Sequence, residues 1–193
     1  MQALRILTDF GDLAVLLPLL LVIFIWLLSA RTKAAALWWV VAAAICMAGT
    51  ALLKIYFEIC SPPIDLRSPS GHASLSTLVY GALALVVATA GKREQRLAAW
   101  AVGGALILGI ALSRVWLQIH NWHEAASGLA VGVAALSLFA KAYRAHPPAA
   151  TSWQPLILAV AVLVLMLHGQ RLHAEELLQA IGAYLRTGPA VCG

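Results

Sequence analysis

The chain has 193 residues, of which 62% are hydrophobic and only 11% are charged, and its formal net charge is +5. Soluble domains carry roughly a quarter charged residues, so this composition excludes an ordinary soluble domain and indicates a membrane protein. The positive charge does not indicate nucleic-acid binding, because the basic residues lie in short segments between apolar runs and form no contiguous patch.

Six apolar segments are predicted to be transmembrane helices, which gives an all-α, polytopic membrane helical bundle. In chain order they are 13–29, 34–53, 72–90, 97–117, 123–140 and 155–168. A bilayer needs about 20 apolar residues per helix, and the sixth segment is short by that measure. The first segment is expected to be retained, because no small-residue cleavage site follows it closely. We expect one membrane-embedded domain over 1–193, with an amphipathic tail over 169–193 lying on the outer face.

The distribution of Lys and Arg predicts how the helices are oriented. The loops after the first, third and fifth segments hold seven basic residues: Arg31, Lys33, Lys92, Arg93, Arg96, Lys141 and Arg144. Three of the six on the other side, Lys54, Arg67 and Arg114, are explained below as site residues. Because short cytoplasmic loops are enriched in Lys and Arg, we expect both termini and the site on the extracytoplasmic side of a bacterial inner membrane.

Three polar clusters are predicted to meet at that outer side. They are Lys54 at the end of the second segment, RSPSGH at 67–72, and SRVWLQIHNWHE at 113–124. Ionisable residues are costly at the level of a membrane, so three clusters at one level indicate a functional site. Ser70 and Gly71 directly precede the third predicted helix. Cations beside the N-terminus of such a helix favour the binding of a phosphate.

The third cluster also contains groups suited to nucleophilic catalysis. His120 stands four residues before Glu124, which on one helix would place the imidazole beside the carboxylate. The carboxylate would then orient the ring, so that its other nitrogen attacks, while a second histidine protonates the leaving oxygen. A zinc site is the alternative for HNWHE, but the spacing matches neither HExxH nor HxxEH.

Two of these clusters resemble signature motifs of the type 2 phosphatidic acid phosphatase (PAP2) superfamily. PSGH at 69–72 and SRxxxxxH at 113–120 match in full, and Glu124 stands where the family has Asp. The family's first motif, KxxxxxxRP, matches only at Lys54 and Pro62, because Ser61 stands where the family has Arg. The resemblance covers about residues 54–128.

The resemblance implies a metal-independent membrane phosphatase with no cofactor, acting on a lipid phosphate or diphosphate through a phosphohistidine. It implies that His120 is the nucleophile, that Glu124 orients it, and that His72 is the general acid. The phosphate would be held by Lys54, Arg114, Ser70 and the backbone of Gly71. Arg67, which lies in the same short loop as Ser61, is the candidate to substitute for the lost arginine, and the alternative is a weak enzyme or a different phosphate geometry. The expected partners are the bilayer and a lipid phosphate such as a polyprenyl diphosphate, phosphatidylglycerol phosphate or phosphatidic acid.

Several alternatives remain open at this stage. A lipid phosphotransferase would form the same intermediate, and a non-catalytic binder or transporter of lipid phosphates would bind without turnover. The oligomeric state is open, and Cys60 and Cys192 either form a disulfide or remain free thiols. Small residues predict close helix packing, with Gly128 and Gly132 on the fifth segment and a stripe of Ala101, Ala105 and Gly109 on the fourth.

Overall fold

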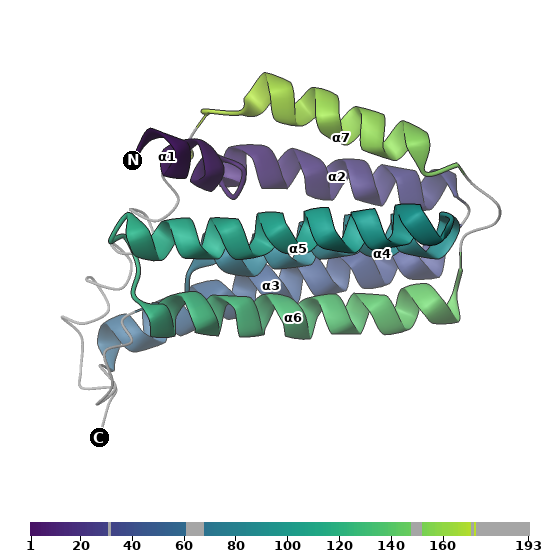
Figure 1. Ribbon diagram of the computed structural model, residues 1–193. Coiled ribbons are helices and arrows are strands. Elements are labelled where there is room, and N and C mark those ends of the chain that lie inside the picture. Colours follow the sequence, from purple (N-terminus) through teal and green to yellow (C-terminus); the bar gives the residue numbers. More distant parts are fainter. Residues whose placement is uncertain (31, 61–67, 148–151, 171, 173–193) are drawn as a thin grey trace.

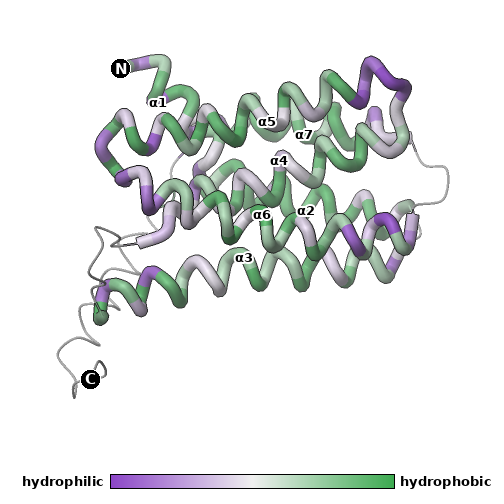
Figure 2. Tube along the Cα trace, turned by 60° about the horizontal axis from the view of Figure 1, so that its bottom comes forward, coloured by the Kyte–Doolittle hydropathy of each residue, from purple (hydrophilic) through white to green (hydrophobic). Residues whose placement is uncertain are grey.

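The structure, a computed structural model, describes residues 1–30, 32–60, 68–147, 152–170 and 172. In this part of the chain every regular element is an α-helix. The helices are α1 (Gln2–Asp9), α2 (Leu13–Ser29), α3 (Lys33–Ile59), α4 (Gly71–Ala90), α5 (Arg93–Trp116), α6 (Trp122–Ala145) and α7 (Gln154–Leu167). They form a bundle whose hydrophilic residues gather at its two ends, while hydrophobic residues cover its middle (Figure 2).

Five helical segments are long and apolar enough to cross a membrane, with α1 and α2 counted together as one. The predicted all-α membrane bundle is therefore confirmed. The sixth predicted span corresponds to α7, which has 14 residues. At 1.5 Å per residue it is about 21 Å long, short of the roughly 30 Å of a bilayer core. It lies along α2 at one side of the bundle (Figure 1).

Two elements at the end of the bundle that holds the predicted site differ from the sequence-based expectation. The helix α3 continues to Ile59, six residues beyond the predicted end of its apolar segment, and its last turns extend past the neighbouring helices (Figure 1). The N-terminal residues form a separate helix, α1, which packs against α5 and is followed by a tight turn before α2. Asp12 ends this turn by capping α2, since its Oδ1 accepts a hydrogen bond from the Ala14 amide at 2.9 Å.

The helix α4 is the core of the bundle. It packs against α2, α3, α5 and α6, and sixteen of its twenty residues are buried. Glycines let α6 approach it closely: a Cβ at Gly132 would meet the Ser74 carbonyl oxygen, and one at Gly128 would meet that of Ser70. The predicted packing through Gly128 and Gly132 is therefore confirmed.

The small-residue stripe predicted on α5 is wrong for two of its three positions. Ala101 and Ala105 are exposed on the outside of the bundle, and Gly109 contacts Leu7 of α1. The face of α5 toward α4 instead carries Gly103, where an added Cβ would lie 3.1 Å from that of Ala84. The helix is therefore rotated relative to the expectation, which brings Ile110 into the core.

The alternation of the helices brings distant parts of the chain to one end of the bundle. The last turns of α3 and α5, the first turns of α4 and α6, and the turn between α1 and α2 all lie there (Figure 1). Lys54, Ser70, Gly71, His72, Arg114, His120 and Glu124 are all carried by these segments. The opposite end holds the described basic residues of the loops after the first, third and fifth predicted segments, which are Lys33, Lys92, Arg93, Arg96, Lys141 and Arg144.

Candidate active site

The centre of the candidate site is a buried pair formed by His120 and Glu124. The Nδ1 atom of His120 lies 2.9 Å from Oε2 of Glu124, and 7% of His120 and 6% of Glu124 are exposed. The sequence predicted this proximity for two residues on one helix, and that reason is wrong because His120 precedes α6. Asn121 caps α6 and accepts from the Glu124 amide at 2.9 Å, while Oε2 of Glu124 accepts from the Asn121 amide at 3.1 Å. This reciprocal cap turns the carboxylate back toward His120.

The turn between α5 and α6 fixes His120 from the other side. The His120 amide donates to the carbonyl oxygen of Arg114 at 3.1 Å, and Gln118 within this turn adopts a positive φ of 57°. Arg114 lies in the last turn of α5 and is only 5% exposed. The turn therefore holds the predicted nucleophile against the end of α5, which carries a buried cation.

The residues at and just before the N-terminus of α4 are also bound to Glu124, through its carboxylate and through its backbone carbonyl oxygen. The Ser68 amide donates to Oε1 of Glu124 at 3.1 Å, and the Ser70 amide donates to the Glu124 carbonyl oxygen at 2.9 Å. Ser70 caps α4, with its Oγ accepting from the Ala73 amide at 3.4 Å. No described protein atom would meet a Cβ added at Gly71 within 4 Å, so the first turn of α4 is open on that side. Exposed amides at a helix N-terminus favour the binding of an anion such as phosphate.

The other predicted site residues have different places in the structure. His72 lies in the first turn of α4, with its Nε2 3.7 Å from Oδ2 of Asp12. Lys54 is half-buried on the part of α3 that continues beyond the predicted apolar segment. Arg67, the predicted substitute for the missing arginine, and Ser61 lie outside the described residues.

Sequence reasoning missed the contribution of the N-terminal segment to this site. Thr8 is buried, and its Oγ1 lies 3.5 Å from Nη1 of Arg114. Asp12 is 5% exposed and faces His72. The available signal was an acidic residue directly before an apolar run, which is typical of a helix cap and is costly near a membrane without a role.

Two further hypotheses from the sequence concern a disulfide between Cys60 and Cys192 and a zinc site at HNWHE. Cys46 is buried and free, and Cys60 is disulfide-bonded at the end of α3. Cys192 and nearly all of the predicted tail lie outside the described residues, so the Cys60–Cys192 pairing stays a prediction. Within the described ranges, no group of three or more His, Cys, Asp or Glu side chains is placed to hold a metal ion.

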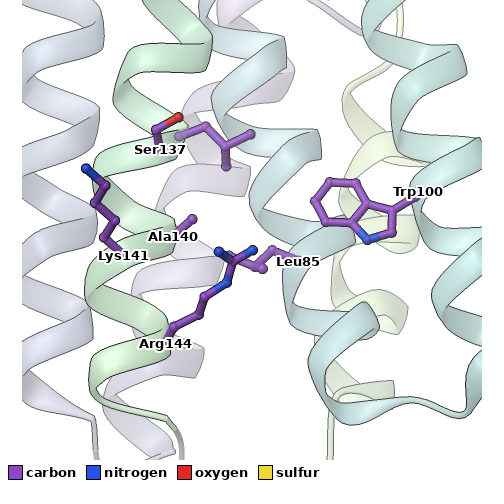
Figure 3. A pocket seen from close by; sticks show the side chains of 7 residues that line it. Leu85, Trp100, Ser137, Ala140, Lys141 and Arg144 are labelled. Carbon is purple, nitrogen blue, oxygen red and sulfur yellow. The ribbon is translucent and has the colours of Figure 1, made fainter.

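A separate cavity of about 280 Å³ lies at the opposite end of the bundle, between α4, α5 and α6 (Figure 3). It is lined by Leu85, Trp100, Leu136, Ser137, Ala140, Lys141 and Arg144. The two cations rise from the last turns of α6, whereas His120 and Glu124 lie at that helix's start, so the cavity is no part of the candidate site.

The fold and this site together define a class of protein. It is a helical membrane protein with a carboxylate-oriented histidine, a buried arginine and a helix N-terminus at one end, an arrangement suited to phosphoryl transfer. Residues 58–148 match the model of the PAP2 superfamily. This part of the chain is therefore similar to a PAP2 superfamily domain, and that superfamily implies phosphatase-type activity.

A curated relative covers nearly the whole chain. It is a protein of Klebsiella pneumoniae described as an uncharacterized 22.5 kDa protein in the cps region, 26% identical over 187 residues. The match covers 92% of this chain and 88% of the relative. No solved structure matches the chain significantly.

Proposed function

We propose that this protein is an integral membrane phosphatase that removes phosphate from a lipid phosphate monoester or diphosphate through a phosphohistidine on His120. The observation that carries the proposal is the buried 2.9 Å contact between His120 and Glu124, whose carboxylate also holds the turn before α4. One acidic residue thereby fixes the nucleophile relative to the amides of the phosphate-binding turn. Such fixed geometry contributes much of the rate enhancement in phosphoryl transfer.

The reaction has two steps. Because Glu124 binds Nδ1 of His120, Nε2 is the nitrogen that attacks phosphorus, and the bond from phosphorus to the lipid oxygen breaks. His72 gives its proton to that oxygen, so the dephosphorylated lipid leaves as a neutral alcohol or as a monophosphate. His72 then takes a proton from water, which attacks phosphorus and breaks its bond to His120, releasing inorganic phosphate. Arg114, Lys54, Arg67 and the N-terminus of α4 would stabilise the charge on the phosphoryl oxygens.

The location of the site supports a substrate that resides in the membrane. The described site residues lie at one end of a bundle of spanning helices, where a lipid head group would stand. The concentration of Lys and Arg at the other end favours an extracytoplasmic site in a bacterial inner membrane. The proposed substrates are polyprenyl diphosphates, phosphatidylglycerol phosphate and phosphatidic acid.

The experiment is a phosphate-release assay on purified protein in detergent with EDTA. Each of the three lipid classes is presented in mixed micelles, and inorganic phosphate is measured with and without an added alcohol acceptor. We expect release from at least one lipid without an acceptor and in the presence of EDTA, since cations of the protein would replace a metal. Transfer only to the acceptor would identify a phosphotransferase, and binding without turnover would identify a lipid-phosphate binder. Activity lost in EDTA and restored by zinc or magnesium would contradict the metal-free mechanism.

A further inference from the structure

Asp12 belongs to neither of the two complete motifs, yet it stands beside the predicted general acid. We propose that Asp12 is a positioning residue that holds the His72 ring in its protonated, proton-donating form, so that the site contains two histidine–carboxylate pairs. This inference rests on the proposed phosphatase function, because it assigns a role within the same reaction. The contact that motivates it is the 3.7 Å separation between Oδ2 of Asp12 and Nε2 of His72.

The carboxylate of Asp12 is fixed before it meets His72. Its Oδ1 accepts from the Ala14 amide at 2.9 Å and from the Leu172 amide at 3.0 Å. These two backbone donors come from the start of α2 and from the segment after α7, so they hold the carboxylate from two directions. Oδ2 is the oxygen that faces the imidazole. Glu124 is held in a similar way, since the Asn121 and Ser68 amides bind it while it faces His120.

The His72 ring is also packed closely against Gly11, the residue before Asp12. A Cβ added at Gly11 would lie 3.2 Å from Cδ2 of His72 and 2.7 Å from a methyl carbon of Ile110. Glycine therefore allows the turn before α2 to lie against the imidazole. The turn is anchored on α4 as well, because the Tyr80 hydroxyl donates to the carbonyl oxygen of Phe10 at 2.7 Å. The turn that carries Asp12 is therefore in contact with α4 at both His72 and Tyr80.

Proton donation by His72 requires a negatively charged group beside its ring. The first turn of α4 carries the positive end of the helix dipole, which disfavours a protonated imidazole at His72. Arg114, whose guanidinium is held by Thr8 in the same N-terminal segment, adds positive charge to the site. An acid catalyst must nevertheless hold a proton when the lipid oxygen leaves. A buried carboxylate within about 4 Å offsets this positive charge and favours the charged ring.

The first test uses nuclear magnetic resonance and does not require turnover. The protein is labelled with [15N]histidine in detergent micelles, and the His72 ring signals are assigned by their loss in His72→Gln. Asp12→Asn keeps the helix cap, because Asn and Asp cap equally well, and it replaces the charged oxygen that faces His72 by an uncharged amide group. We expect the His72 nitrogens to shift toward those of a neutral ring at pH 7, while the His120 signals stay in place. Superimposable His72 signals in the wild type and Asp12→Asn would overturn the proposal, whatever the enzyme's activity.

The second test compares two leaving groups, phosphatidic acid and p-nitrophenyl phosphate. Nitrophenolate leaves readily without a proton, whereas the lipid alcohol depends on one. Asp12→Asn should therefore lower kcat about tenfold or more on phosphatidic acid and far less on p-nitrophenyl phosphate. Glu94→Gln, an exposed change at the opposite end in the first turn of α5, is the matched control and should change neither rate.

The outcomes of this comparison are distinct. Equal losses on both substrates would show a merely structural role and would contradict the proposal. A wild-type protein that hydrolyses no phosphoester would contradict the proposed function, and the resonance experiment would still decide whether Asp12 governs the His72 ring.

Discussion

Glu124 is bound on both carboxylate oxygens, and this decides how its role should be tested. Oε1 accepts from the Ser68 amide, while Oε2 accepts from the Asn121 amide and contacts His120. Truncation to Ala would leave these donors without an acceptor, at a cost of about 1 to 3 kcal/mol for each buried group. A loss of activity in such a variant could therefore come from misfolding as well as from the lost catalytic group. Glu124→Gln preserves the shape and most of the hydrogen bonds, and removes the charge that stabilises a positively charged His120.

We expect Glu124→Gln to lower kcat by about 100-fold or more and His120→Ala to abolish turnover. Because the two residues act as a unit, the double variant should be no worse than His120→Ala alone. Glu124→Asp places the family's own residue at this position and should retain activity. Steady-state phosphate release measures all four proteins, and circular dichroism checks their folding. Near-normal turnover by a folded His120→Ala protein would refute the phosphohistidine mechanism.

The residues of the site differ in how far the sequence could predict them. His120, Glu124, Ser70 and Arg114 stand in continuous motifs with fixed spacing, so their proximity was predicted from the sequence. Asp12 lies 60 positions before His72 in the chain, and their contact depends on how α1, α2 and α4 pack. No local spacing encodes such a contact. The one available signal was the free-energy cost of placing the ionisable side chain of Asp12 at the edge of a membrane.

At the scale of elements, the position of α4 relative to α6 depends on Gly128. This glycine lies against the backbone of Ser70, and the Ser70 amide binds the Glu124 carbonyl oxygen at 2.9 Å. Gly128→Ala would force the turn before α4, which is proposed to bind phosphate, away from α6. We expect about tenfold or greater loss of kcat, since small displacements of catalytic groups are costly, together with about 1 to 3 kcal/mol of destabilisation from overpacking.

Gly104→Ala is the matched control for this prediction. A Cβ at Gly104 on α5 would meet nothing described within 4 Å, and Ala favours a helix over Gly by about 1 kcal/mol. Gly104→Ala should therefore be as active as the wild type and equally or more stable. Phosphate release and thermal unfolding in detergent measure both variants. Wild-type activity and stability in Gly128→Ala would contradict the packing of α6 on α4.

The elements themselves were predictable to different degrees. The apolar runs predicted the spanning helices, because hydrophobicity governs insertion into the bilayer. Hydropathy did not predict where α3 ends, since backbone hydrogen bonds continue the helix to Ile59 after the apolar segment stops. The rotation of α5 was also missed. Small residues occur on more than one of its faces, and only packing against α4 selects the face with Gly103.

The whole molecule has two chemically different ends. The described residues of the candidate site lie at one end of the bundle. The other end holds the start of α3, the start of α5 and the end of α6 (Figure 1), which carry Lys33, Lys92, Arg93, Arg96, Lys141 and Arg144. The sequence predicted this division, because helices that alternate in direction place every second loop at the same end. Short loops rich in Lys and Arg are retained in the cytoplasm, so the charged end should face inward and the candidate site outward.

Cysteine labelling in intact cells tests this orientation. The three native cysteines are first replaced. A single cysteine is then placed at Gln2, at the end of the bundle that holds the candidate site, or at Glu94, at the opposite end, and both positions are exposed. We expect a membrane-impermeant maleimide to label Gln2→Cys in intact spheroplasts and to label Glu94→Cys only after permeabilisation. Each variant must first release phosphate from the lipid substrate, so that labelling reports on the folded protein. Labelling of Glu94→Cys from outside, with protection of Gln2→Cys, would show the inverse topology and place the candidate site on the cytoplasmic side.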